Sequence, residues 1–245
     1  EIAEMGGTLS WQTGNGVWAD DIPGNWMLGG SGTSFMKGDS VEFAQGGVVT
    51  ISGDVNPRDI SVSGSAEVVF SGSGSIAGDA ALVKSGPGTL RVATHNAYTG
   101  GTTLNGGTIV VESKYALGVG NITLNGGTLN LGSYDIDNDI VANGGSLSST
   151  VYDGNFTVQG AVALSGSLLG SVRLQNNGSL SGGALQGAHI ESYGATINSS
   201  ISGGSSVYVY DNTTLGGNNT FTGKTYLVSG ELSLMSDTAL GNSTL

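Results

Sequence analysis

Cysteine is absent from this chain of 245 residues, and proline, charged residues and aromatic residues are all scarce. Without cysteine there are no disulfides, which leaves a reducing compartment or secretion from a bacterium; we favour the second. Proline occurs only three times among 45 glycines, which argues against a collagen or a proline-rich linker. No run of about 18 apolar residues is present, so we expect no membrane-spanning helix and no direct membrane insertion of this segment.

Charged residues make up 11% of the chain, with 19 acidic and 7 basic side chains and a formal net charge of −12. Proteins that bind nucleic acid present a clustered basic face, whereas the basic residues here are scattered along the sequence. We therefore expect no nucleic acid partner. The hydrophobic fraction of 38% is enough to build a core, so the sequence predicts an ordered fold.

The first 45 residues differ in composition from the rest of the chain. All three tryptophans, Trp11, Trp18 and Trp26, lie in this segment. A solenoid needs a cover for the apolar end of its first coil, and large aromatic side chains bury much area per residue. We interpret residues 1–45 as an N-terminal cap and residues 46–245 as the solenoid, truncated at its C-terminal end. The alternative for the aromatic segment is a carbohydrate-binding platform.

From residue 46 onwards, short alternations of apolar and polar residues end at Gly, Ser or Asn, which is typical of short strands joined by tight turns. Apolar positions recur every 17 to 20 residues, for example from Val92 to Ile109 and from Leu215 to Leu232. No helical pattern accompanies this period. The predicted fold class is all-β, a parallel β-helix (solenoid) of roughly a dozen coils, with Ile109 and Leu232 pointing inward.

One stretch of about 35 residues returns within the chain. It begins at Val83 and recurs at a constant offset of 123 residues, so that Asn96 corresponds to Asn219 and Tyr98 to Phe221. The second copy is less regular and lacks the Lys-x-Gly-x-Gly that opens the first copy. A motif repeated inside one chain indicates stacked structural units.

The first copy reads K-S-G-P-G-T-L-R-V over residues 84–92, N-A-Y-T-G-G-T-T-L-N-G-G-T-I-V-V over 96–111 and A-L-G over 116–118. It resembles the repeat associated with passenger domains of bacterial autotransporters (type V secretion). The resemblance implies a right-handed, single-stranded parallel β-helix whose repeats aid folding during export. It also implies display at the bacterial cell surface, anchored by an outer-membrane β-barrel that is not part of this sequence.

For function, the resemblance implies an adhesin that mediates host attachment, cell–cell aggregation or biofilm formation. Our hypothesis is that polar ladders on a rigid β-helix each add weak hydrogen bonds, which sum to avidity. The expected partners are the same protein on neighbouring cells, host-surface glycans or matrix proteins, and O-glycosylation of Ser or Thr is expected as a possible modification. The candidate interaction face consists of Asn105, Asn125, Asn143, Asn177, Asn212, Thr103 and Thr123. The alternative for the asparagines is that they only form corners.

Two other functions stay open, an inert structural stalk with the active region elsewhere in the full-length chain and a polysaccharide-acting β-helix enzyme. We predict no catalytic residue, no cofactor and no metal site. The G-x-S-x-G motif of serine hydrolases is absent. His95 is expected in a surface turn and His189 as an outward strand residue, too far apart in sequence for an ordinary zinc site. The acidic run at 134–139 is expected to be a solvated loop rather than a cation site.

Overall fold

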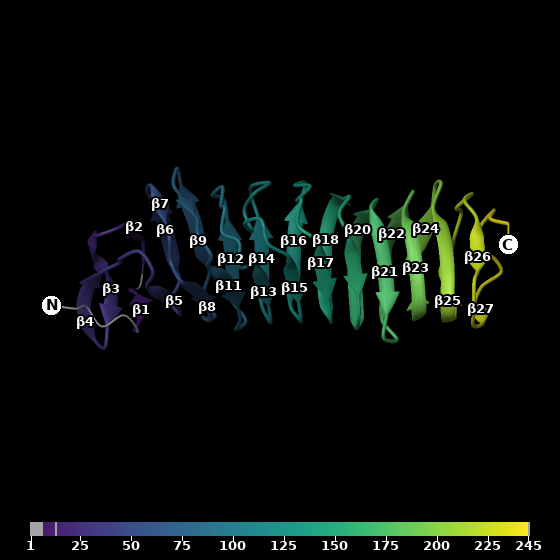
Figure 1. The fold of residues 1–245 in the computed structure, drawn as a ribbon, viewed down its shortest axis with the longest axis horizontal. Coiled ribbons are helices and arrows are strands. Elements are labelled where there is room, and N and C mark those ends of the chain that lie inside the picture. Colours follow the sequence, from purple (N-terminus) through teal and green to yellow (C-terminus); the bar gives the residue numbers. More distant parts are fainter. Residues whose placement is uncertain (1–6, 13, 245) are drawn as a thin grey trace. The chain divides into compact units, whose positions relative to one another are not determined.

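The computed structural model describes residues 7–12 and 14–244, which form β-strands and turns and no helix. The fold is a parallel β-solenoid of about 11 turns, so the predicted fold class is confirmed (Figure 1). Two compact units make up the chain: unit 1 contains Glu1–Ile122 and Gly127–Leu129, and unit 2 contains Thr123–Gly126 and Asn130–Leu245. Within the described residues, no helix has the length and apolar character that a bilayer crossing needs.

In unit 1 the strands of successive coils stack in three sets, which we call faces 1, 2 and 3. Face 1 pairs β1, β5, β8, β11 and β13 in parallel, and face 2 does the same with β2, β6, β9, β12 and β14. Face 3 is the short pair β7 and β10. The strands are β1 (Thr8–Trp11), β2 (Gly16–Trp18), β3 (Pro23–Leu28), β4 (Ser31–Ser34), β5 (Ser40–Phe43), β6 (Gly47–Ile51), β7 (Asp54–Val55), β8 (Asp59–Val62), β9 (Val68–Gly72), β10 (Ser75–Ile76), β11 (Ala81–Lys84), β12 (Thr89–Val92), β13 (Thr102–Leu104) and β14 (Thr108–Val111).

Unit 2 has the same three-faced winding, with longer strands that turn a corner without a break. Two strands, β15 (Ile122–Leu124) and β16 (Thr128–Gly132), contain residues of both units. The other strands of unit 2 are β17 (Ile140–Ala142), β18 (Gly145–Tyr152), β19 (Phe156–Val158), β20 (Ala161–Leu168), β21 (Ser171–Gln175), β22 (Ser179–Gln186), β23 (His189–Ile197), β24 (Ser200–Ser202), β25 (Ser206–Leu215), β26 (Thr225–Leu227) and β27 (Leu232–Leu234). Face 1 of unit 2 runs through β17, β19, β21, the first halves of β23 and β25, and β26. The second halves of β23 and β25 lie on face 2 with β27.

The register corrects the spacing read from the sequence at two places. Leu90 pairs with Ile109, and Val92 pairs with Val111, so this coil is 19 residues long and Val92 is not the equivalent of Ile109. In the same way Leu215 pairs with Leu234 rather than with Leu232. Both errors are shifts of two residues, because neighbouring inward positions in a strand are two apart and both carry apolar side chains.

The inward positions form apolar columns, as predicted for Ile109, which has no exposed surface. Leu232 is half-buried rather than buried. Among the described strands, β27 pairs only with β25, so the other side of Leu232 has no neighbouring coil to cover it. The burial of Leu232 therefore differs from the expectation, although its strand position agrees with it.

The N-terminal segment packs its aromatic side chains into one cluster. The Trp18 ring lies 5.6 Å from Trp26, 5.4 Å from Phe35 and 5.5 Å from Phe43 between ring centroids. Trp11, Trp18 and Trp26 are at most 3% exposed, so the alternative of an exposed carbohydrate-binding platform is wrong. The pairs β1–β3 and β3–β4 are antiparallel, unlike the parallel coils, but the division at residue 45 stays a prediction.

Candidate functional site

The structure places the seven predicted interaction positions on the outside of the coils. The five asparagines are exposed, and the two threonines are half-buried. Thr103 lies in β13 and Asn105 directly after it, in unit 1. The other five, Thr123, Asn125, Asn143, Asn177 and Asn212, belong to unit 2.

Two of the seven are joined by a hydrogen bond: Asn143 donates from Nδ2 to Oδ1 of Asn125 over 2.7 Å. These two residues follow β17 and β15 and form one step of a polar ladder. Asn177 sits elsewhere, in a turn with φ of 60°. Asn212 accepts a hydrogen bond from the backbone N–H of Glu231 at 2.9 Å. The contacts of Asn177 and Asn212 are therefore also those of residues that form corners of the coil, which is the alternative stated for the asparagines in the sequence analysis.

Sequence reasoning missed a second set of outward residues on face 1 of unit 2. Register aligns Thr157 with Arg173, Arg173 with Glu191, Glu191 with Tyr208, and Tyr208 with Tyr226. We call these five residues the face 1 row. The steps between them are 173 − 157 = 16, 191 − 173 = 18, 208 − 191 = 17 and 226 − 208 = 18 residues. This variation in step length, and the absence of a burial pattern, hid the row in the sequence.

Charge on the face 1 row is concentrated in one ion pair. Arg173 donates from Nε and Nη2 to Oε2 of Glu191 at 2.9 and 2.7 Å. This hydrogen bond and the negative charge raise the pKa of Arg173. Partial burial alone would raise the pKa of Glu191, but the hydrogen bonds from Arg173 and His189 outweigh it and the pKa is lowered. Both groups are charged at neutral pH and hold each other in place.

Tyrosine rings form two stacks, one within the face 1 row and one beside it. Tyr208 and Tyr226 stack with centroids 4.6 Å apart and planes inclined by 13°. Tyr193 stacks on Tyr210 at 4.7 Å, and the guanidinium of Arg173 lies over the Tyr193 ring at 5.6 Å. Desolvation first, and then the neighbouring Tyr226, raise the pKa of Tyr208. The phenol of Tyr208 therefore stays neutral at physiological pH.

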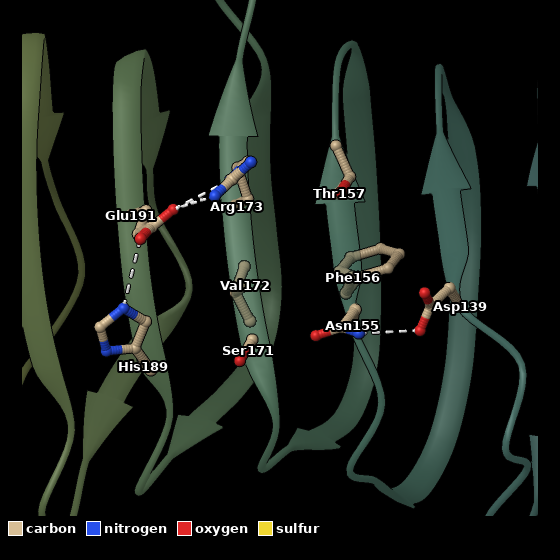
Figure 2. Close-up of a pocket in the computed structure, with 9 residues that line it drawn as sticks. All are labelled: Asp139, Asn155, Phe156, Thr157, Ser171, Val172, Arg173, His189 and Glu191. Atoms are coloured by element: carbon tan, nitrogen blue, oxygen red, sulfur yellow. Dashed lines mark hydrogen bonds and ion pairs between the residues drawn. The ribbon is translucent and has the colours of Figure 1, made fainter.

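A pocket of about 350 Å³ lies beside the face 1 row. Figure 2 shows Asp139 and Asn155 at one side, Arg173, Glu191 and His189 toward the other, and the short side chains of Thr157 and Ser171 between them. Asn155 donates to Asp139 over 2.9 Å. The hollow exists because small side chains are flanked by large ones on neighbouring coils. The lining residues are Asp139, Asn155, Phe156, Thr157, Ser171, Val172, Arg173, His189 and Glu191.

The histidines and the acidic run lie as expected. His95 is exposed in a turn against Tyr115, and His189 is exposed in β23. The acidic run is a loop whose aspartates Asp135, Asp137 and Asp139 are exposed. Among the described residues, no three His, Asp or Glu side chains come close enough to hold a metal ion.

The repeated motif has a structural core built on Asn96. Its Oδ1 accepts a hydrogen bond from the backbone N–H of Ile76 at 3.0 Å, and its Nδ2 donates to the carbonyl of Ala116 at 2.6 Å. Ile76 lies one coil before Asn96 and Ala116 one coil after it. One buried side chain thus links three successive coils and satisfies two buried backbone groups.

Asn219 makes the same links in the second copy. Its Oδ1 accepts from the N–H of Ile201 at 2.8 Å, and its Nδ2 donates to Ala239 at 2.6 Å and to Gly216 at 3.1 Å. We call Asn96 and Asn219 the coil clamps. The asparagine of the motif is therefore explained by backbone groups that only a side chain with both a donor and an acceptor can satisfy.

The Lys-x-Gly-x-Gly opening is explained by a buried ammonium group. Lys84 has no exposed surface, and its Nζ donates to the carbonyls of Ser85, Gly86 and Gly106 at 2.6, 2.9 and 3.3 Å. Burial lowers the pKa of Lys84. Gly107 has φ of 71°, and a Cβ there would lie 2.3 Å from the carbonyl oxygen of Gly88 and 2.7 Å from Nζ of Lys84, so this turn beside the ammonium needs glycine.

The fold and these motifs define a parallel β-solenoid that contains two copies of one repeat. Residues 82–111 and 212–234 match the passenger-associated-transport-repeat. The chain is also 32% identical, over 143 residues, to the Adhesin BmaC autotransporter of Brucella suis biovar 1 (strain 1330). These two matches confirm the predicted resemblance to an adhesin-like autotransporter passenger.

The match to the Brucella protein covers 57% of this chain and 4% of the relative's length. The chain therefore corresponds to a small part of that protein. No solved structure matches this chain significantly.

Proposed function

We propose that this passenger segment belongs to a surface-displayed adhesin and contacts its partner through outward side chains on face 1 of unit 2. The observation that carries the proposal is the face 1 row, in which Arg173, Glu191 and the stacked Tyr208 and Tyr226 point outward in register. Tyrosine and arginine are enriched among residues that dominate binding energy at protein interfaces. A sheet face holds them at fixed spacing, so little conformational entropy is lost on binding.

The partners we propose are a second copy on a neighbouring cell, host-surface glycans and matrix proteins. The roles that follow are attachment, aggregation and biofilm formation. The predicted polar positions add to this surface, and the hydrogen bond between Asn125 and Asn143 supports a ladder arrangement there. The name of the Brucella relative, an adhesin, supports the same class of function.

A polysaccharide-cleaving function finds less support in the pocket. Asp139 and Glu191 both line it, but a glycosidase needs one carboxyl group with a raised pKa to act as the acid. The pKa of Glu191 is lowered. Glu191 is therefore poorly suited to act as that acid, and we propose binding rather than hydrolysis at this pocket.

Beads coated with the purified chain test the proposal. We expect them to aggregate or to attach to epithelial cells or matrix proteins, and the double variant Tyr208→Ser, Tyr226→Ser to reduce attachment at least about fivefold, as expected for hot-spot tyrosines. Tyr115→Ser, an exposed tyrosine of unit 1 outside the row, is the control and leaves attachment unchanged. Beads that neither aggregate nor attach would contradict the proposal and favour an inert stalk.

A further inference from the structure

The pocket beside the face 1 row offers hydrogen-bond donors and acceptors at short spacing. Asp139 supplies a carboxylate, Ser171 and Thr157 supply hydroxyls, and Arg173 and His189 supply N–H groups. Sugar hydroxyl groups both donate and accept, so a site that holds several of them needs both kinds of group. Figure 2 shows these side chains next to one another on three adjacent coils, with Asp139 on the loop before β17.

The charge of the pocket selects against anionic ligands. Its one arginine is already paired with Glu191 at 2.7 Å, and Asp139 leaves the lining acidic. The whole chain carries a formal net charge of −12. Sialic acid, uronate or sulfate groups would be repelled at this site.

One end of the pocket has aromatic character. The exposed ring of His189 lines the pocket and packs against Tyr208 with centroids 4.8 Å apart. A pyranose presents C–H groups on its ring faces, which pack against aromatic side chains, while its hydroxyls reach polar groups. The volume of about 350 Å³ is at the small end of ligand pockets, which suits one or two sugar units and not a long segment of protein.

We propose that this pocket binds a neutral sugar unit of a glycan. The inference rests on the proposed adhesin function and names one ligand class and one site for it. Asp139 contacts the hydroxyls from one side and Arg173 from the other, and Ser171 contacts them between the two. The Arg173–Glu191 pair keeps the guanidinium fixed, so the site is formed before the ligand arrives.

The test is titration of the full chain with neutral oligosaccharides ending in glucose, galactose or N-acetylglucosamine, and with sialylated and uronate-containing ones. Thr157→Trp and Ser171→Trp each fill the hollow, and either is expected to weaken neutral glycan binding at least about tenfold. Ser61→Trp changes an outward residue of face 1 in unit 1 and is the matched control. Melting temperatures of all variants show whether each is folded. If one filling variant does not fold, the other still tests the site.

Binding of a neutral oligosaccharide that is lost in the folded filling variants and kept in Ser61→Trp is the expected result. The inference is overturned if no neutral oligosaccharide binds, if anionic ones bind as tightly, or if filling the hollow changes nothing. Bead attachment separates the two proposals. Attachment that persists in Thr157→Trp overturns the sugar site alone, whereas an unmodified chain that attaches to nothing overturns the adhesin proposal.

Discussion

The two copies of the repeat keep the same coil clamp and differ in what surrounds it. Asn96 and Asn219 each accept from an isoleucine N–H of the preceding coil and donate to an alanine carbonyl of the following coil. The first copy adds the buried ammonium of Lys84, whereas residue 207, at the same offset, is a buried valine. The clamp is thus the common element, and the lysine is an addition to one copy.

A second difference shows how one lost group is replaced. In the first copy the hydroxyl of Tyr98 pairs with Thr102 at 2.7 Å. Phe221 has no hydroxyl, and Thr225 pairs instead with Ser243 at 2.7 Å. The threonine is buried in both copies, so both arrangements satisfy its hydroxyl, and the motif tolerates Phe for Tyr because another partner is present.

Charge placed in the core should give the largest effect and the sharpest contrast between copies. Ile109→Asp puts an unpaired carboxylate at a position with no exposed surface and should lower the free energy of unfolding by about 4 kcal/mol. Leu232→Asp, at a half-buried position, should lose well under half of that. Urea unfolding followed by tryptophan fluorescence measures the loss of unfolding free energy in Ile109→Asp. Hydrogen exchange measures the loss in Leu232→Asp. Equal losses would show that the two positions are not buried as described.

Removing each coil clamp tests whether the copies share one device. Asn96→Ala and Asn219→Ala each leave a buried N–H and a buried carbonyl unpaired, and each should cost about 3 kcal/mol. Faster hydrogen exchange of the Ile76 and Ile201 amides, respectively, should accompany the loss. Asn218→Ala, at an exposed neighbouring position, is the control. If the amides keep their protection, the clamps do not join the coils.

Lys84→Met removes the element that only the first copy has. Three carbonyls lose their donor, and we expect a loss of about 2 kcal/mol. Burial lowers the pKa of Lys84 below 10.5, so near that pH the unfolded chain binds more protons than the folded chain. The stability of the unmodified protein relative to Lys84→Met should therefore rise as pH increases toward 10.5.

Chemical unfolding between pH 7 and 10.5 measures this difference. Lys114→Met, at an exposed lysine, is the control and should show no such trend. A difference that falls with pH would contradict the burial of the Lys84 ammonium.

The smallest effect is expected for Tyr98→Phe, which gives the first copy the residue of the second. Thr102 loses its 2.7 Å partner but keeps a longer hydrogen bond to the carbonyl of Leu117 at 3.4 Å. We expect a loss of about 1 kcal/mol, read as a lower melting temperature. A loss as large as that of Asn96→Ala would mean that the tyrosine, and not the asparagine, is the main link.

The sequence predicted the winding because apolar residues recur once in each coil. This recurrence is recognisable even when single positions are matched to the wrong residue of the next coil. It misplaced the register by two at Ile109 and Leu232, because inward neighbours two apart are equally apolar. The face 1 row was missed for a different reason. Outward residues such as Arg173 and Tyr208 carry no burial pattern, and the pocket depends on the sizes of side chains from different coils, which only the register brings together.

The central claim is that the repeat copies are scaffold and that recognition lies in outward residues between them. A chain with Thr157, Arg173, His189, Glu191 and Tyr208 all changed to serine tests this most directly, by bead attachment together with hydrogen exchange of the Ile76 and Ile201 amides. We predict that attachment is lost while both amides stay protected. Attachment that survives with the scaffold intact would contradict the account.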